Sequence, residues 1–557
     1  MEALTTRIGR DAAGPRPLTR LREAATRPYT ILLVVTSVWG VAFATFSYLA
    51  YRGFLTRRFD LGNMVQAVWS TAHGHPLSVT EVTGQQIVRL GVHVDPLLAV
   101  YAPFWRIWPS PVLLISTQAF AVAFGALPLF WLARKHLHSE KLALVLSLAF
   151  LLHPALEWQV MNDFHPTTLA IPFLLLAIWF ADEDKPWQFV AACIPVLASQ
   201  EHMGVFVAGL AVWYAFRHRR FLFGACFAAL ALAWVVIAFQ VVIPHYGGGP
   251  SPYLDRYAGA EGSPLDIVGT LFTDPLQIAR ELGTPGDVFF LIALMMPFAG
   301  IFLRAWGLAL VAAPQVALNL LSARPSDLRI DGHINSPTIP ILAAATVLGV
   351  AKFKPSSQPT AAGVVLLWAA FAGYILGPLR FIGTPILPLG VTIAALWLIP
   401  LRPRVRLLGA TALLAALFMV YAPHPRELFR GGYLSSQVDP ARAAREHAVS
   451  LVPSNASVSA TNHLGSHLSE RQDIYSFPLV EPADWIVVDR EDTWMPVLIS
   501  SRRPLPDSSI PPIEGFERPL RMTETIRALR QDPQWEVVFD SEGIMVFRRV
   551  APSAASQ

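Results

Sequence analysis

Charged residues are scarce in this sequence. Only 15% of the 557 residues are Asp, Glu, Lys or Arg, against roughly 25% in an ordinary soluble protein. The hydrophobic set AVILMFWYC makes up 54% of the chain, and the mean hydropathy is +0.45. A soluble protein of this length needs more charge on its surface, and a disordered chain would be poor in apolar residues. The composition therefore predicts an α-helical polytopic membrane protein in contact with the lipid bilayer.

Cysteine is nearly absent, with Cys193 and Cys226 as the two in the chain. This count excludes a disulfide-rich scaffold, and both cysteines lie in apolar stretches, where we interpret them as small buried hydrophobic residues. The net charge of +4 is modestly basic, but no cluster of Lys and Arg alternates with aromatic residues as a nucleic-acid groove requires. We therefore expect no nucleic-acid partner and interpret the basic excess as an orientation signal.

Apolar runs recur between residues 30 and 422 and predict about thirteen transmembrane helices. Several runs are shorter than the roughly 20 residues that a perpendicular helix needs, so two neighbours could form one re-entrant pair. Val94–Trp108 is apolar but broken by Pro96 and Pro103, and we interpret it as an interfacial helix. The expected spans are 30–51, 111–133, 142–156, 167–181, 187–199, 203–216, 221–244, 288–303, 305–322, 338–351, 360–378, 382–401 and 406–422.

Basic residues are distributed unequally between the predicted inner and outer connections. If the N-terminus is cytoplasmic, the short inner connections carry 13 Lys or Arg residues and the short outer ones carry 3. The tail 1–29 is basic and lies on the inner side. The asymmetry predicts a multi-pass protein of the plasma (inner) membrane with a cytoplasmic N-terminus. An odd number of spans then places the C-terminal region outside.

The composition changes after Tyr421. Residues 423–557 are rich in Arg, Asp and Glu and predict a small soluble α/β domain on the extracytoplasmic side. Val537–Phe539 and Met545–Phe547 flank Asp540–Gly543, a pattern that predicts a β-hairpin. The other expected elements are strands at 457–460 and 485–489 and helices at 440–451 and 523–530.

Asp, Glu and His residues collect on the outer connections, in the long first loop 52–110 and beyond. Ionisable groups near membrane ends usually mark a site, because they are costly unless solvated or paired. Asp60 follows the first span closely and could accept a proton from an acceptor hydroxyl. A salt bridge from Asp60 to Arg57 or Arg58 at the head-group level is the alternative.

Three pairs of polar residues lie on the outer side: His93 with Asp95, Asp163 with His165, and Glu201 with His202. They suit a divalent cation such as Mg²⁺ or Mn²⁺, or a phosphate neutralised by imidazoles. Helix capping is the alternative, because Asp163 precedes a span and Asp95 precedes a proline. The candidates that could join Asp60 as cation ligands are His93, Asp95, Asp163, His165 and Glu201. His202 adds a further nitrogen.

The outer loop 245–287 is long and begins with three glycines and a proline. Long ordered loops tend to be functional, so a lid over a cavity and a flexible linker are both open interpretations. Arg256 in this loop, Arg380 in a short outer turn and Arg58 beside Asp60 are candidate phosphate clamps. Anchoring to lipid head groups explains these arginines equally well.

Short motifs along the chain resemble a bacterial membrane-protein family known as domain of unknown function 2079. The resemblance covers roughly residues 50–550. Its motifs are Arg58–Asn63 with Gln66 and Trp69, His93–Pro96, Gln118, Asn162–Pro166, Gln200–His202, Asn319–Ser322, Val458–Asn462 and Ala483–Asp489.

That family is similar in layout to integral-membrane glycosyltransferases of the GT-C fold. The resemblance implies a sugar transfer from a polyprenyl-phosphate donor to an acceptor, with inversion, and Asp60 matches the position of the catalytic acid after the first span. The usual aromatic residue before the late histidine is missing, because the chain reads Asp331-Gly332-His333-Ile334. This departure leaves the role of His333 open, as a candidate substrate or cation ligand.

The sequence therefore favours a lipid-linked sugar transferase that acts on the outer face. Its partners would be a polyprenyl-phosphate-linked sugar and a glycan, lipid or protein acceptor. The alternatives are a transporter or lipid flippase and a non-catalytic assembly protein of the cell envelope. A transporter usually has ionisable residues or broken helices at mid-depth and an internal repeat. The expected spans hold almost no charge, and no repeat is evident.

Overall fold

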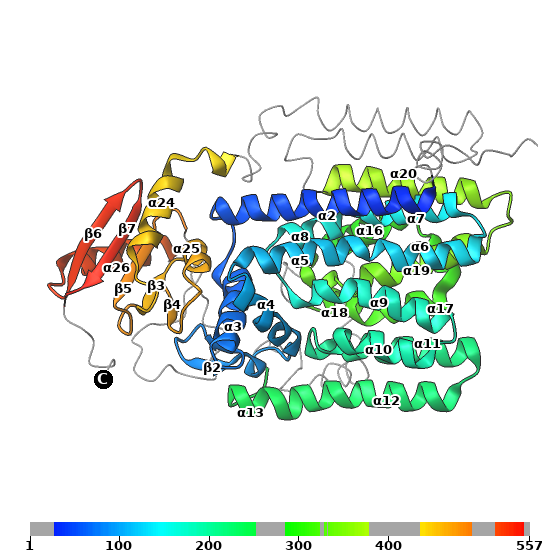
Figure 1. Cartoon of the computed structure of the whole chain (residues 1–557), viewed down its shortest axis with the longest axis horizontal. Helices are drawn as coiled ribbons and strands as arrows, with labels where there is room; N and C mark the ends of the chain where they lie inside the picture. Colours follow the sequence, from blue (N-terminus) through cyan, green and yellow to red (C-terminus); the bar gives the residue numbers. More distant parts are fainter. Residues whose placement is uncertain are drawn as a thin grey trace, which may run out of the picture.

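The structure, a computed structural model, describes residues 27–251, 284–322, 328–330, 332–377, 435–492 and 518–550. Helices run side by side in a bundle, and a β-sheet domain lies beyond one end of it (Figure 1). We call this the sheet end. The opposite end, where Lys135 and Arg217 contact Asp182, is called the basic end.

Several bundle helices, among them α2, α5, α9 and α10, begin at a proline, whose missing N–H costs nothing at the first helical position. The bundle consists of α2 (Pro28–Arg52), α5 (Pro111–Phe124), α6 (Ala126–Leu137), α7 (Glu140–Leu151), α8 (Pro154–Met161), α9 (Pro166–Asp182), α10 (Pro186–Leu197), α11 (Gly204–His218), α12 (Phe221–Ile237), η5 (Ala238–Val242), α13 (Ile243–Gly247), α16 (Pro285–Met295), η7 (Met296–Phe298), η8 (Ile301–Ala305), α17 (Trp306–Ala309), η9 (Leu310–Ala312), α18 (Ala313–Leu320), η11 (His333–Asn335), α19 (Thr338–Ala351) and α20 (Gln358–Leu376).

Within the described residues, five helices are long and apolar enough to cross a membrane, and six if the pair α7–α8, bent by 49°, is one span. The helices follow the expected apolar runs closely; α5 and α6, for example, form one apolar segment where 111–133 was expected. The expected spans 382–401 and 406–422 lie outside the described residues. The membrane character is therefore supported, and the count of thirteen spans stays a prediction.

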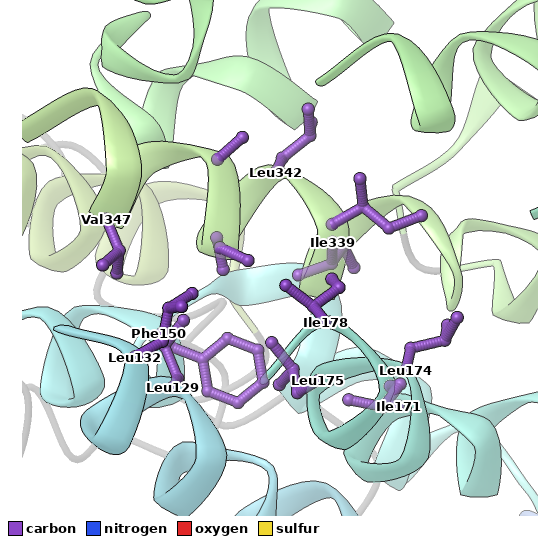
Figure 2. Close-up of a cluster of buried hydrophobic side chains, with 14 of the residues drawn as sticks. Leu129, Leu132, Phe150, Ile171, Leu174, Leu175, Ile178, Ile339, Leu342 and Val347 are labelled. Atoms are coloured by element: carbon purple, nitrogen blue, oxygen red, sulfur yellow. The ribbon is translucent and has the colours of Figure 1, made fainter. Parts of the chain in front are cut away.

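The bundle core is built from aliphatic side chains. Figure 2 shows Leu129 and Leu132 of α6, Phe150 of α7, Leu175 of α9 and Ile339 of α19 packed together. Because lipid is as apolar as these side chains, close packing rather than the hydrophobic effect holds such helices together. This core fixes the sheet ends of α9 and α19 relative to each other.

The long loop 52–110 folds as a compact layer at the sheet end. It contains η1 (Arg58–Gly62), α3 (Asn63–Ala72), β1 (Ser78–Thr80), β2 (Gln86–Val88), η2 (Arg89–Gly91), η3 (Pro96–Tyr101) and α4 (Ala102–Ile107). The apolar side chains of this loop form their own core with the first turns of α5 and α9. The expected interfacial segment Val94–Trp108 corresponds to η3 and α4.

A close backbone contact joins this layer to the end of α13. A Cβ atom on Gly91 would lie 2.5 Å from the backbone nitrogen of Gly247, and one on Gly247 would collide with the carbonyl oxygen of Gly91. Both positions therefore need glycine. Gly247, the first glycine after α13 begins, thus serves as a packing contact.

The C-terminal domain carries a mixed five-stranded sheet of order β4-β3-β5-β7-β6. β3 is parallel to β4 and β5, and β7 is antiparallel to β5 and β6. The predicted hairpin is confirmed as β6–β7, whereas β4 was not expected. The elements are η13 (Ser435–Gln437), α24 (Pro440–Leu451), β3 (Val458–Ala460), α25 (Asn462–His467), β4 (Ile474–Ser476), β5 (Trp485–Asp489), α26 (Arg518–Gln531), β6 (Trp535–Ser541) and β7 (Ile544–Arg549).

Arg58 anchors this domain to the loop 52–110. Its guanidinium is buried and donates to the hydroxyl of Ser476 at 2.9 Å and to the carbonyl oxygens of Thr80 and Ile474 at 2.9 and 2.5 Å. Gln66 adds a bond to the carbonyl oxygen of Gln472 at 2.7 Å. Edge strand β4 is therefore covered by the loop, which removes an exposed sheet edge.

Candidate active site

Asp60 lies in a π-helical turn that follows α2 after the short connection 53–57. In this turn, η1, the N–H of Gly62 donates to the carbonyl oxygen of Arg57 at 3.0 Å, five residues back. Such turns are rare and often occur at functional sites. Gly62 also lets α25 approach, because a Cβ atom there would lie 3.1 Å from the Cα atom of Ser466 in that helix and 2.6 Å from the hydroxyl of Ser469 just after it. The side chain of Asp60 remains 29% exposed.

Two cationic or titratable groups surround the Asp60 carboxylate. His165 Nε2 lies 3.4 Å from Asp60 Oδ1, and Arg57 Nη1 lies 3.5 Å from Asp60 Oδ2. The Arg57 backbone N–H donates to Asp163 Oδ1 at 2.9 Å, and the Asp163 side chain is only 3% exposed. The Arg57 alternative is thus confirmed as a contact of Asp60, while Arg58 points to the sheet domain. Asp163 does not cap α9, whose N-cap residue is His165.

Gln118 of α5 holds the segment between α8 and α9. Its side-chain amide donates to the carbonyl oxygen of Asp163 at 2.8 Å, and its Oε1 accepts from the N–H of His165 at 2.9 Å. Asp163 has a φ of +62°, in the left-handed region that a non-glycine residue rarely adopts. Gln118 therefore fixes a strained turn that aims Asp163 and His165 at Asp60. The sequence resemblance included Gln118, but no local pattern indicated this role.

His333 joins this cluster from a distant part of the chain. Its ring stacks on that of His165, with centroids 3.7 Å apart and planes 10° apart. Asn335, in the same turn, accepts from the amide of Asn319 at 2.8 Å and donates to the carbonyl oxygen of Arg329 at 3.0 Å. The late histidine therefore belongs to the Asp60 cluster even though the preceding aromatic residue is absent.

The pKa values of the two carboxyl groups in the cluster are shifted in opposite directions. Burial disfavours the charged form of Asp163, and the charge of Asp60 adds to this effect, so the pKa of Asp163 is raised. Burial would also raise the pKa of Asp60, but the hydrogen bond and charge of His165, together with Arg57, outweigh it and lower that pKa below its ordinary value. Asp60 is therefore ionised at neutral pH, and Asp163 holds a proton more readily.

His93 and Glu201 form a second group nearby. His93 Nδ1 lies 3.1 Å from Glu201 Oε1, and the N–H of Val94 donates to Glu201 Oε2 at 2.9 Å. Burial alone would raise the pKa of Glu201, but the charge and hydrogen bond of His93 lower it. His202 follows in the same turn, η4 (Glu201–Met203). His93 and His202 both interact electrostatically with His333, so the two groups act on each other.

Asp95 is held apart from these groups by an ion pair. Arg89 Nε and Nη2 both lie 2.8 Å from Asp95 Oδ2, and the two side chains are 3% and 2% exposed. Asp95 is the N-cap residue of η3 and Pro96 follows it at the start of the helix, as predicted. Its side chain makes no capping hydrogen bond there, because the carboxylate binds Arg89 instead. The other candidate arginines, Arg256 and Arg380, lie outside the described residues.

The donors do not converge as a cation site in this arrangement. Among the residues that the structure describes, no group of three or more His, Cys, Asp or Glu side chains is placed to hold a metal ion. Asp60 and Asp163 share Arg57, and His93 is paired with Glu201. The divalent cation stays a prediction.

Comparisons with known proteins give a family and distant structural likenesses. No curated protein matches the chain. Two crystal structures of ArnT from Cupriavidus metallidurans, one in the apo state and one bound to undecaprenyl phosphate, are 13% identical, cover 92% of this chain and 98% of theirs, and have a TM-score of 0.49. The family model described as predicted membrane protein (DUF2079) matches residues 50–546. The chain therefore belongs to the DUF2079 family of membrane proteins, as its motifs indicated.

Proposed function

We propose that this protein is a membrane glycosyltransferase that moves a sugar from a polyprenyl-phosphate donor to an acceptor hydroxyl. The observation that carries the proposal is the cluster around Asp60. It offers one ionised, partly exposed carboxylate in contact with His165, which in turn stacks on His333. A hydroxyl nucleophile needs a positioned base, and a departing phosphate needs nearby proton donors or positive charge.

In the proposed reaction Asp60 is the general base. The acceptor oxygen attacks the anomeric carbon of the sugar while its proton passes to Asp60, and the bond from that carbon to the phosphate oxygen breaks with its electron pair on the phosphate. A single displacement of this kind inverts the anomeric centre. Asp163, whose pKa is raised, suits the role of holding the proton next to Asp60. The imidazoles of His165, His333, His93 and His202 are suited to donate hydrogen bonds to the departing phosphate. No step uses a metal ion.

The orientation of the protein is part of the proposal. The basic end would face the cytoplasm, as basic loops do in the inner membrane. The Asp60 cluster and the sheet domain would then lie on the extracytoplasmic side. A lipid-linked sugar would reach the cluster from the outer leaflet.

Replacement of Asp60 by Asn tests the proposal. The amide keeps the shape of the carboxylate but cannot accept a proton, so transfer should fall by about 10² to 10⁴. The measurement is release of polyprenyl phosphate by purified protein incubated with a panel of polyprenyl-phosphate sugars. Asp540→Asn, on the exposed β6–β7 hairpin and 43% exposed, is the matched control. Full turnover by a correctly folded Asp60→Asn variant would refute the proposal.

A transporter is the second candidate, and one observation favours it. The break between α7 and α8 carries His153, and the first turn of α8 carries Glu157. Both side chains are buried, and Glu157 Oε2 has no hydrogen-bond partner among the described residues. Buried ionisable groups at a broken helix often line a transport path. If Glu157→Gln abolishes movement of a lipid-linked sugar across vesicle membranes while Asp60→Asn does not, the protein is a transporter and not a transferase.

A further inference from the structure

A cavity of about 520 Å³ opens at the basic end of the bundle, far from the Asp60 cluster. Its walls come from the basic ends of α6, α11 and α19 and from η8 and α17, on the side of the bundle away from the sheet domain (Figure 1). The volume lies within the roughly 300–1,000 Å³ that is typical of small-molecule sites. Nothing in the proposed transfer uses it.

Apolar side chains line most of this cavity, and basic ones stand at its edge. Leu308 and Leu348 form apolar wall, while Arg217 and Lys352 supply positive charge. The guanidinium of Arg217 lies 5.5 Å from the centre of the Trp213 ring, which also lines the cavity. An apolar chamber with a cationic rim suits an amphiphile with an anionic head group.

The positive charge at the rim is only partly neutralised. Asp182 is shared by Lys135 and Arg217, at 2.7 and 2.5 Å. Lys352 Nζ instead donates to the carbonyl oxygen of Arg304 at 2.5 Å. Among the described residues, neither Lys352 nor Arg304 has a carboxylate within ion-pair distance. These two cations are therefore available to an anion.

The surface beside the cavity is of the kind that lipid covers. Trp306 lines the cavity and is 66% exposed, and Leu303 and Leu310 on the flanking helices are also exposed. Tryptophan is enriched at the level of lipid head groups. Basic pockets between membrane helices on the cytoplasmic side bind anionic lipid head groups.

We propose that this cavity binds an anionic phospholipid of the leaflet at the basic end. Lys352, with Arg304 beside it, would hold the phosphate, Trp306 would lie at head-group depth, and the first carbons of an acyl chain would lie along Leu308 and Leu348. The proposal is independent of the transferase function. It assigns a second lipid contact at the opposite side of the membrane from Asp60.

Native mass spectrometry of the full chain, released from nanodiscs, tests this assignment. The protein should retain phosphatidylglycerol in preference to phosphatidylcholine. Lys352→Gln should weaken phosphatidylglycerol retention about fivefold, the effect of one basic residue near a membrane surface. Lys354→Gln, an exposed lysine at the same end that does not line the cavity, is the matched control and should change nothing.

A second variant fills the cavity without altering charge. Gly307 lines it, and a Cβ atom there would meet no heavy atom within 4 Å. Gly307→Leu should therefore fold normally and lose the phospholipid. Equal retention of both lipids, equal losses in the two lysine variants, retention in Gly307→Leu, preference for added polyprenyl phosphate, or full competition by inorganic phosphate would each overturn the proposal.

Discussion

Breaking the Arg89–Asp95 ion pair should destabilise the protein strongly, whereas removing both charges should not. The two side chains are almost fully buried and meet at 2.8 Å. At an effective dielectric constant of 20, two unit charges at that distance attract by about 6 kcal/mol. Much of this attraction offsets desolvation, but removing one partner leaves the other charge buried and unpaired. The expected loss for Asp95→Asn or Arg89→Met alone is about 3–5 kcal/mol.

The double variant Arg89→Met/Asp95→Leu separates this structural role from cation binding. Because an apolar pair of similar size avoids desolvation, it should be near neutral or more stable than either single variant. The assay is unfolding in mixed micelles with increasing SDS, followed by tryptophan fluorescence. Asp540→Asn, in an exposed ion pair with Arg530, should cost at most about 1 kcal/mol. If the two single losses simply add, or if Asp95→Asn costs nothing but abolishes a cation-dependent activity, the reasoning fails.

Three further predictions concern the domain contact and the cluster. His467 is partly buried and stacks on the rings of Tyr51 and Phe54, and the desolvation of its imidazole lowers its pKa to about 3. The unfolded imidazole takes up a proton near pH 6.5 and the folded one does not, so stability should fall from about pH 6.5 down to about 3, by at most about 1.4 kcal/mol per pH unit. Melting curves of His467→Phe should lack this part of the slope. Arg58→Met should cost about 2–4 kcal/mol, because three acceptors lose their donor, and proteolysis should then release the sheet domain faster, while the exposed Arg548→Met should have no such effect. His333→Phe preserves the stacked ring and should melt normally but lose transfer; normal transfer would exclude a role for its imidazole.

The elements near the membrane could be predicted largely from local pattern. The helices α2, α9, α19 and α20 coincide with apolar runs, because an apolar segment of that length is stable as a helix in lipid. The hairpin β6–β7 could also be predicted, since its turn residues lie between two β-prone runs. Strand β4 was missed because it is only three residues long and depends on its neighbours.

The Asp60 cluster could be predicted from the sequence only in part. The sequence pointed to Asp60, Asp163 and His165 together, and the structure brings them together. It grouped Asp95 and Arg58 with them, although Asp95 pairs with Arg89 and Arg58 binds the sheet domain. Asp95 could not be sorted from the others by sequence, because an ionisable residue in an outer loop has the same local pattern whether its partner is a ligand or a buried arginine.

The sequence by itself therefore determined the class of protein, the course of most helices that the structure describes and the grouping of Asp60, Asp163 and His165. These properties follow from hydropathy and charge, which act over short stretches of chain. Only the tertiary structure decided that His333 stacks on His165, that Gln118 sets the turn at Asp163 and that basic residues rim an apolar cavity. Such contacts join residues far apart in the chain, and packing geometry rather than local preference selects them.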